Sequence, residues 1–134
     1  MLYAPQFKLR AFETLSDAAR IALLKKLLEA LAAVNETWLG EHPEAPWLYQ
    51  SGVRYEEEPP GRDDWQDIPE TIALRVGDCE DLGCWRLAEL RVRAGERAQA
   101  FVKQSVLGSR TVYHVAVQRA DGSLEDPSRI LGMR

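Results

Sequence analysis

The spacing of the apolar residues changes along this chain, and that change limits the folds that it can adopt. Between about residues 16 and 39, apolar side chains recur every three or four positions, which is the spacing of one face of an α-helix. Between residues 111 and 119, Tyr113, Val115 and Val117 alternate with a second set of side chains, as in a β-strand. Helical patterns come before strand patterns, so the sequence predicts an α+β fold with an N-terminal helix.

The sequence predicts two helices together with their ends. Ser16 can cap the first helix, and Gly40 is a natural residue to end it. Asp78 can cap the second helix, which places Cys79 in its first turn, and this helix is expected to end at Gly95. The apolar side chains of both helices indicate that they pack on the core of their own domain.

Two strands are predicted near the end of the chain, over residues 98–104 and 111–119. The dipeptide Asp121-Gly122 follows them and is typical of a tight hairpin turn. A turn centred near residue 120 would place Asp126 opposite His114, with their Cα atoms within about 5.5 Å of each other. The hairpin therefore predicts that these two polar side chains are neighbours.

Composition and charge exclude several classes of protein. The chain has 134 residues, of which 46% are hydrophobic, and this predicts a single domain over residues 1–134. Its 17 basic and 21 acidic residues give a net charge of −4, which lacks the basic footprint of a nucleic-acid-binding protein. No apolar run approaches the roughly 18 residues of a membrane span, and no signal peptide is recognisable. We therefore expect a cytoplasmic protein with neither a nucleic-acid partner nor a membrane partner.

The chain contains two cysteines, too few for a disulfide scaffold or a zinc site built from cysteines alone. Cys84 lies inside the second predicted helix and is expected to be a core thiol. Cys79 lies at the helix N-terminus, where the helix dipole lowers the pKa of a thiol and favours the nucleophilic thiolate. His114 could take the proton of that thiol, and Asp126 could hold the imidazole in the required tautomer. These three residues form a candidate catalytic triad.

Three acidic residues, Asp78, Glu80 and Asp81, flank Cys79. Their negative charge would raise the pKa of the thiol, which opposes the effect of the helix dipole. They either cap the helix, as acids in a first turn commonly do, or hold a hard cation such as Ca²⁺. The residues alone leave these two alternatives open.

Residues 40–70 form a long segment that is rich in proline, glycine and acids, including Pro59, Pro60 and Gly61. Its large aromatic side chains argue against a bare linker and for a functional loop region: Trp47, Tyr49, Tyr55 and Trp65. A cysteine nucleophile also needs a donor for the oxyanion that forms during attack. The candidates are the backbone N–H of Cys79 and three side chains, those of Trp65, Gln66 and Gln50.

Three segments of this chain together resemble the transglutaminase-like cysteine peptidase superfamily: Gly77-Asp78-Cys79-Glu80-Asp81-Leu82, Tyr113-His114-Val115-Ala116-Val117 and Glu125-Asp126-Pro127. The bacterial transglutaminase-like cysteine peptidases are the most similar, in a short form that is also found among phage and prophage genes. Trp65-Gln66-Asp67-Ile68-Pro69 is similar to a stretch that precedes the cysteine in that group, and the resemblance covers about residues 48–132.

The resemblance implies a papain-like core in which the helix of the nucleophile packs on a small antiparallel sheet. It implies that Cys79 is the nucleophile, His114 the general base and Asp126 the orienting acid. It further implies a calcium site at Asp78 and Glu80, although thiol chemistry itself requires no cofactor.

We therefore expect a thiol acyl-transfer enzyme, a cysteine peptidase, deamidase or transglutaminase, that acts on a carbonyl of a protein or peptide. The alternative is a non-catalytic interaction or assembly protein that keeps the same fold. Such a protein would bind phage structural proteins and would be found in the virion. Its contact surface would be either the loop surface of Trp47, Tyr49, Tyr55 and Trp65 or the termini of the chain.

Overall fold

A computed structural model describes residues 1–59 and 63–134 of the chain. Pro60 and Gly61, which belong to the loop region predicted from the sequence, lie outside the described residues. The described residues combine helices with small sheets, which confirms the α+β class. Within this part of the chain, no helix is both long enough and apolar enough to cross a membrane.

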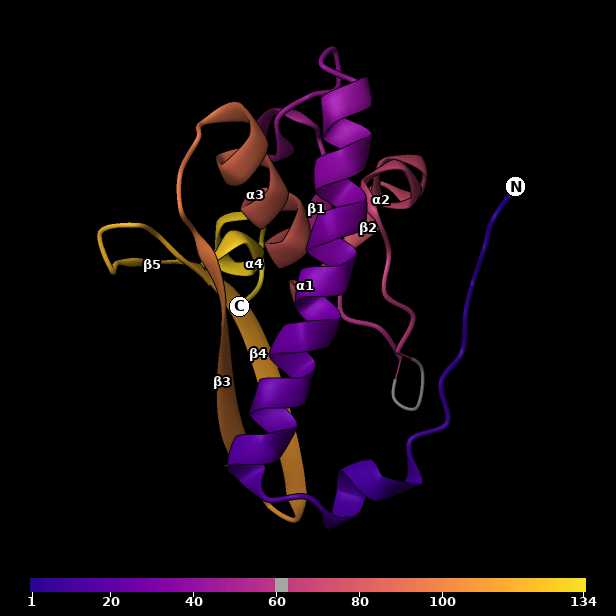
Figure 1. The fold of residues 1–134 in the computed structure, drawn as a ribbon, viewed down its shortest axis with the longest axis vertical. Helices are drawn as coiled ribbons and strands as arrows, with labels where there is room; N and C mark the ends of the chain where they lie inside the picture. The colour runs from indigo at the N-terminus through magenta and orange to yellow at the C-terminus, as the bar shows by residue number, and fades with distance from the viewer. Residues whose placement is uncertain (60–62) are drawn as a thin grey trace.

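The first long helix, α1 (Asp17–Glu41), runs the length of the molecule (Figure 1). The Ser16 side chain accepts a hydrogen bond from the Ala19 N–H and caps the helix as predicted. The prediction that the helix ends at Gly40 was wrong, because Gly40 is helical and the C-cap is His42. Before α1, a short 3₁₀ helix, η1, spans Arg10–Thr14, and residues 1–9 have no regular structure.

The second long helix, α3 (Cys79–Arg93), begins with a reciprocal pair of caps. The Asp78 side chain accepts a hydrogen bond from the Asp81 N–H, and the Asp81 side chain accepts one from the Asp78 N–H. This capping box satisfies two backbone donors that a helix start would otherwise leave unpaired. The predicted position of Cys79 in the first turn is confirmed, and the helix ends two residues before Gly95.

An antiparallel sheet follows, made of β3 (Gln99–Leu107), β4 (Arg110–Gln118) and the short β5 (Leu124–Glu125), in the order β3-β4-β5. In Figure 1 the β3–β4 hairpin lies along the N-terminal half of α1. Side chains of α1, α3 and the sheet form one apolar cluster: Leu28, Ala32, Cys84, Leu87, Leu90, Ala98, Ala100, Val102, Val115 and Val117. The buried Cys84 is therefore a core thiol, as predicted.

A second, parallel pair of strands lies before α3 and was not predicted. It pairs β1 (Arg54–Tyr55) with β2 (Val76–Gly77). The helix α2 (Ile68–Leu74) leads into β2, and Figure 1 shows it beside these strands. Two further short elements are the 3₁₀ helix η2 (Leu48–Gln50) and the helix α4 (Pro127–Ile130).

These elements pack around a second apolar cluster: Leu39, Leu48, Val53, Ile68, Leu82, Trp85 and Ala88. Because α1 and α3 contribute to both clusters, they join the two halves of the core. The buried Asn35 of α1 adds a polar link, since its Oδ1 accepts a hydrogen bond from the Ile68 N–H at 2.9 Å. Together these contacts hold the start of α3 between the loop segment and the sheet.

Candidate active site

Cys79 is the first residue of α3, so its side chain lies at the N-terminus of that helix. The backbone N–H of Val115 donates a hydrogen bond to the Cys79 sulfur, which places the thiol against β4. One turn further along α3, a Cβ atom on Gly83 would lie only 3.0 Å from the Val115 Cγ1. The close approach of helix and strand therefore brings Cys79 to the part of β4 that carries His114.

His114 and Asp126 form a hydrogen bond of 2.8 Å between Nε2 and Oδ2. The predicted register was nevertheless wrong: Val117 pairs with Glu125, so the turn is centred one residue later than expected. Asp126 lies beyond the end of β5, where it caps α4, and its carboxylate reaches His114 diagonally. The side chains of His114 and Asp126 are 26% and 23% exposed, so solvent reaches the pair.

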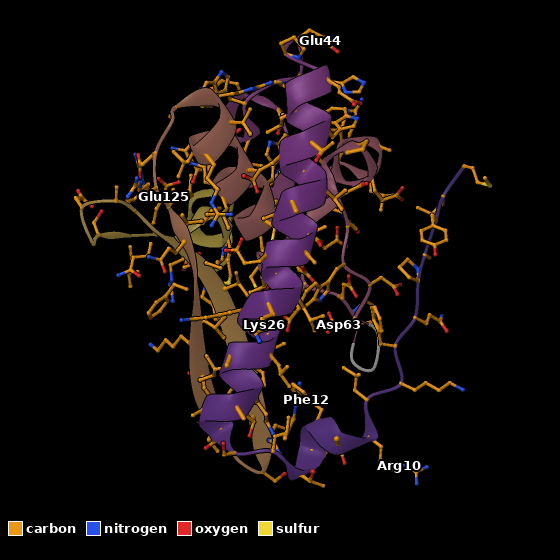
Figure 2. The ribbon with its side chains drawn as sticks, viewed as in Figure 1. Arg10, Phe12, Lys26, Glu44, Asp63 and Glu125 are labelled. Carbon is orange, nitrogen blue, oxygen red and sulfur yellow. The ribbon has the colours of Figure 1, made fainter. Side chains whose placement is uncertain are left out.

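Glu125 fixes the chain immediately before Asp126. Its carboxylate accepts hydrogen bonds from Arg86 Nε at 2.6 Å, from Arg119 Nη1 at 2.8 Å and from the Tyr49 hydroxyl. Figure 2 labels Glu125 on the side of the molecule where β5 lies. The sequence motifs do not predict this group. One signal was available, because Arg86 follows Cys79 by seven residues and so lies on the same face of α3 two turns later.

The surroundings of Cys79 favour its neutral form. Burial raises the pKa of the Cys79 thiol well above its ordinary range, and the negative charge of Glu80 raises it further. The hydrogen bond from Val115 acts in the opposite direction but is the smaller effect. The lowering that the helix N-terminus predicts is therefore outweighed, and the resting residue is a thiol.

The three acids beside Cys79 have different partners. Asp78 and Asp81 cap the helix, and Asp81 also accepts a hydrogen bond from the Gln66 N–H at 2.7 Å. Glu80 is half-buried and hydrogen bonds with the Asp78 side chain. Burial raises the pKa of Glu80, and the hydrogen bond to Asp78 raises it further, because two adjacent carboxylates repel each other unless they share a proton.

A group of carboxylates lies in front of the helix start. Oxygens of Glu58, Asp63 and Asp78 lie within 4.8 Å of one another, and Figure 2 shows Asp63 beside the segment that leads to α2. Three carboxylate oxygens are the donors that a hard cation such as Ca²⁺ prefers. Of the two residues expected to hold calcium, Asp78 belongs to this group, whereas Glu80 hydrogen bonds with Asp78 from outside it.

Two of the side chains expected to donate to an oxyanion, those of Trp65 and Gln66, have other hydrogen-bond partners. The Trp65 indole N–H donates to Asp63 at 3.1 Å. The Gln66 amide nitrogen donates to a threonine hydroxyl at 3.2 Å and to a backbone carbonyl at 3.1 Å. The backbone N–H of Cys79 differs, because the first residue of a helix has no acceptor within the helix. Of these candidates, the Cys79 N–H is the best placed to bind an oxyanion.

Comparison of the chain with models of protein families, with curated proteins and with solved structures gives no significant match. What the protein can do must therefore be argued from its own residues and their geometry.

Proposed function

We propose that this protein is a thiol acyl-transfer enzyme in which Cys79, His114 and Asp126 act together on the carbonyl group of a protein or peptide. The observation that carries the proposal is the His114–Asp126 hydrogen bond on β4, next to the strand residue that donates to the Cys79 sulfur. A papain-like core, with the start of one helix against the strand that bears the histidine, belongs to the same proposal. Two distant parts of the sequence supply the thiol and the base, which supports a joint role.

In this mechanism the Cys79 sulfur attacks the carbonyl carbon as its proton moves to His114. The new carbon–sulfur bond pushes the π electrons of the carbonyl onto oxygen. Collapse of this oxyanion breaks the bond to the leaving amine, which takes the proton from His114, and leaves a thioester on Cys79. Water then releases an acid, as in proteolysis or deamidation, or a second amine takes the acyl group, as in crosslinking. Asp126 holds the imidazole in the tautomer that accepts the proton.

The neutral resting thiol makes the base essential to this account. Because burial raises the pKa of Cys79, almost no thiolate is present before substrate binds. A calcium ion, if bound, would be held by carboxylates of Glu58, Asp63 and Asp78, and its charge would favour the thiolate. The chain's own residues then transfer the proton and orient the base.

The proposal is tested by acetylation of the chain with p-nitrophenyl acetate, followed by mass spectrometry of the cysteine peptides. We expect the acetyl group on Cys79, with buried Cys84 as the internal reference. Replacing the base, His114→Ala, is expected to slow acetylation by about 10²–10⁴-fold. Equal rates in the wild-type chain and in His114→Ala would contradict the proposal.

The acetylation experiment also distinguishes a thiol acyl-transfer enzyme from the second candidate function, that of a non-catalytic assembly protein. The observation that favours it is a group of exposed apolar side chains in the first nine residues: Met1, Leu2, Tyr3, Phe7 and Leu9. The aromatic loop offers less surface than expected, because Tyr49, Tyr55 and Trp65 pack against the core clusters and Trp47 is the exposed one of the four. An inert Cys79, together with self-association that is lost on deleting residues 1–9, would favour assembly.

A further inference from the structure

We infer that the hydroxyl of Tyr55 is the side-chain donor that stabilises the oxyanion formed when Cys79 attacks a carbonyl group. The inference rests on the acyl-transfer function proposed above and adds a residue to it. Trp65 and Gln66, two of the side chains that the sequence suggested for this role, already donate to other groups. Tyr55 comes from a different part of the chain, the short strand β1.

The pairing of β1 with β2 determines where the Tyr55 side chain points. Tyr55 is the register partner of Gly77, and register partners in neighbouring strands project to the same face. A Cβ atom on Gly77 would lie 3.1 Å from the Asp81 Cβ and 3.2 Å from the Leu82 Cδ2, both in the first turns of α3. Tyr55 therefore projects toward the end of α3 that begins with Cys79.

The backbone holds Tyr55 firmly in this position. Its own N–H donates to the Leu131 carbonyl at 3.0 Å, and the N–H of Glu56 donates to the Gly77 carbonyl at 2.9 Å. The ring packs against the apolar cluster that includes Leu82. A donor that is fixed before the reaction stabilises developing charge without the cost of reorganisation.

The Tyr55 hydroxyl interacts electrostatically with Cys79 and is available as a hydrogen-bond donor. Burial raises the pKa of Tyr55 to about 12, and the charges of Glu57 and of a Cys79 thiolate contribute to the rise. At neutral pH the hydroxyl is therefore protonated and can donate. It makes no hydrogen bond to any residue in the ranges 1–59 and 63–134.

In the acylation step, the carbon–sulfur bond forms, the thiol proton moves to His114 and the π electrons of the carbonyl move onto oxygen. Two donors then face that oxygen, the backbone N–H of Cys79 and the hydroxyl of Tyr55. When the oxyanion collapses, the carbonyl forms again and the leaving group departs with the electrons of its bond. Tyr55 keeps its own proton throughout.

The test compares two reactions of Cys79 that differ in whether an oxyanion forms. Acetylation by p-nitrophenyl acetate passes through an oxyanion, whereas alkylation by iodoacetamide displaces iodide and forms none. In Tyr55→Phe we expect acetylation to slow by at least about 10-fold, toward the about 10²–10³-fold effect of losing one oxyanion donor. Alkylation is expected to stay within about 2-fold of the wild-type rate. Tyr3→Phe, at a tyrosine that is 87% exposed, is the matched control and should change neither rate.

Each other outcome overturns the inference. Unchanged acetylation in Tyr55→Phe would show that the hydroxyl does not stabilise the oxyanion. Equal slowing of acetylation and alkylation would show that Tyr55 affects the reactivity of the thiol or the folding of the site, and not the oxyanion. The proposed function fails separately, when wild-type acetylation is no faster than that of His114→Ala, and the role of Tyr55 falls with it.

Discussion

At the residue scale, two opposing effects act on the thiol of Cys79, the proposed nucleophile. Its position at the start of α3 favours a thiolate, but burial and the neighbouring Glu80 raise the pKa of the thiol. Two other acids beside the thiol, Asp78 and Asp81, cap the helix that positions the sulfur. The proposed mechanism needs no free thiolate beforehand, because in it the proton moves to His114 during attack.

Glu80 makes stability depend on pH at the same place. Burial and the hydrogen bond to Asp78 raise the pKa of Glu80 in the folded state, so the folded chain keeps a proton that the unfolded chain releases above about pH 4.5. The free energy of unfolding should therefore fall as pH rises from 5 to 8. Glu80→Gln keeps a hydrogen-bond donor and cannot ionise. Its free energy of unfolding should therefore fall less between pH 5 and pH 8 than that of the wild-type chain. Urea unfolding at pH 5 and at pH 8 measures these free energies.

The matched control for this prediction is Glu44→Gln, at an exposed residue between α1 and η2. It should leave the pH dependence as it is in the wild-type chain. The prediction is contradicted if Glu80→Gln and the wild-type chain lose the same free energy of unfolding between pH 5 and pH 8.

At the level of elements, α3 packs against β4, so Cys79 lies close to the strand that carries His114, the proposed base. Gly83 allows this contact, because a side chain there would lie 3.0 Å from Val115. On the opposite flank, Arg86 and Glu125 connect α3 with β5 through hydrogen bonds of the ionised side chains. The helix α3 is thus in contact with the strand that carries His114 and is hydrogen bonded to Glu125, the residue before Asp126.

Gly83→Ala should lower the free energy of unfolding by about 1–3 kcal/mol, because the added methyl group overpacks the contact with Val115. It should also slow acetylation of Cys79, since the added methyl group disturbs the packing of α3 on Val115. The control is Gly40→Ala, near the end of α1, where nothing lies within 4 Å of a Cβ atom. There alanine should raise the free energy of unfolding by about 0.5–1 kcal/mol. The role of the contact between Gly83 and Val115 would be contradicted if Gly83→Ala raised the free energy of unfolding as much as Gly40→Ala does.

For the whole molecule, local signals in the sequence were enough to predict the main elements. Ser16 and Asp78 cap the two long helices as expected, and the alternation before Asp121-Gly122 gave the strand of His114. These features depend on neighbours along the chain. The α+β class and the closeness of His114 and Asp126 follow from them.

Features that depend on distant contacts could not be predicted in this way. A shift of the turn by one residue moved Asp126 out of the strand, and turn chemistry alone does not fix its centre. The pairing of Tyr55 with Gly77 joins residues 22 positions apart, each in a strand of two residues, too short for a periodic pattern. The burial that raises the pKa of Cys79 likewise arises only when α3 meets the sheet.

The central claim is that Cys79, His114 and Asp126 act as one unit, and the rate of Cys79 acetylation in a double-mutant cycle tests it most directly. The cycle compares the wild-type chain, His114→Ala, Asp126→Asn and the double variant. Asparagine can still cap α4, so Asp126→Asn removes the charge while keeping the local fold. We predict that each single substitution slows acetylation by about 10²–10⁴-fold and that the double variant is no slower than His114→Ala. The account would be contradicted if the rate reductions of the two single variants multiplied in the double variant. It would also be contradicted if Asp126→Asn were acetylated at the wild-type rate.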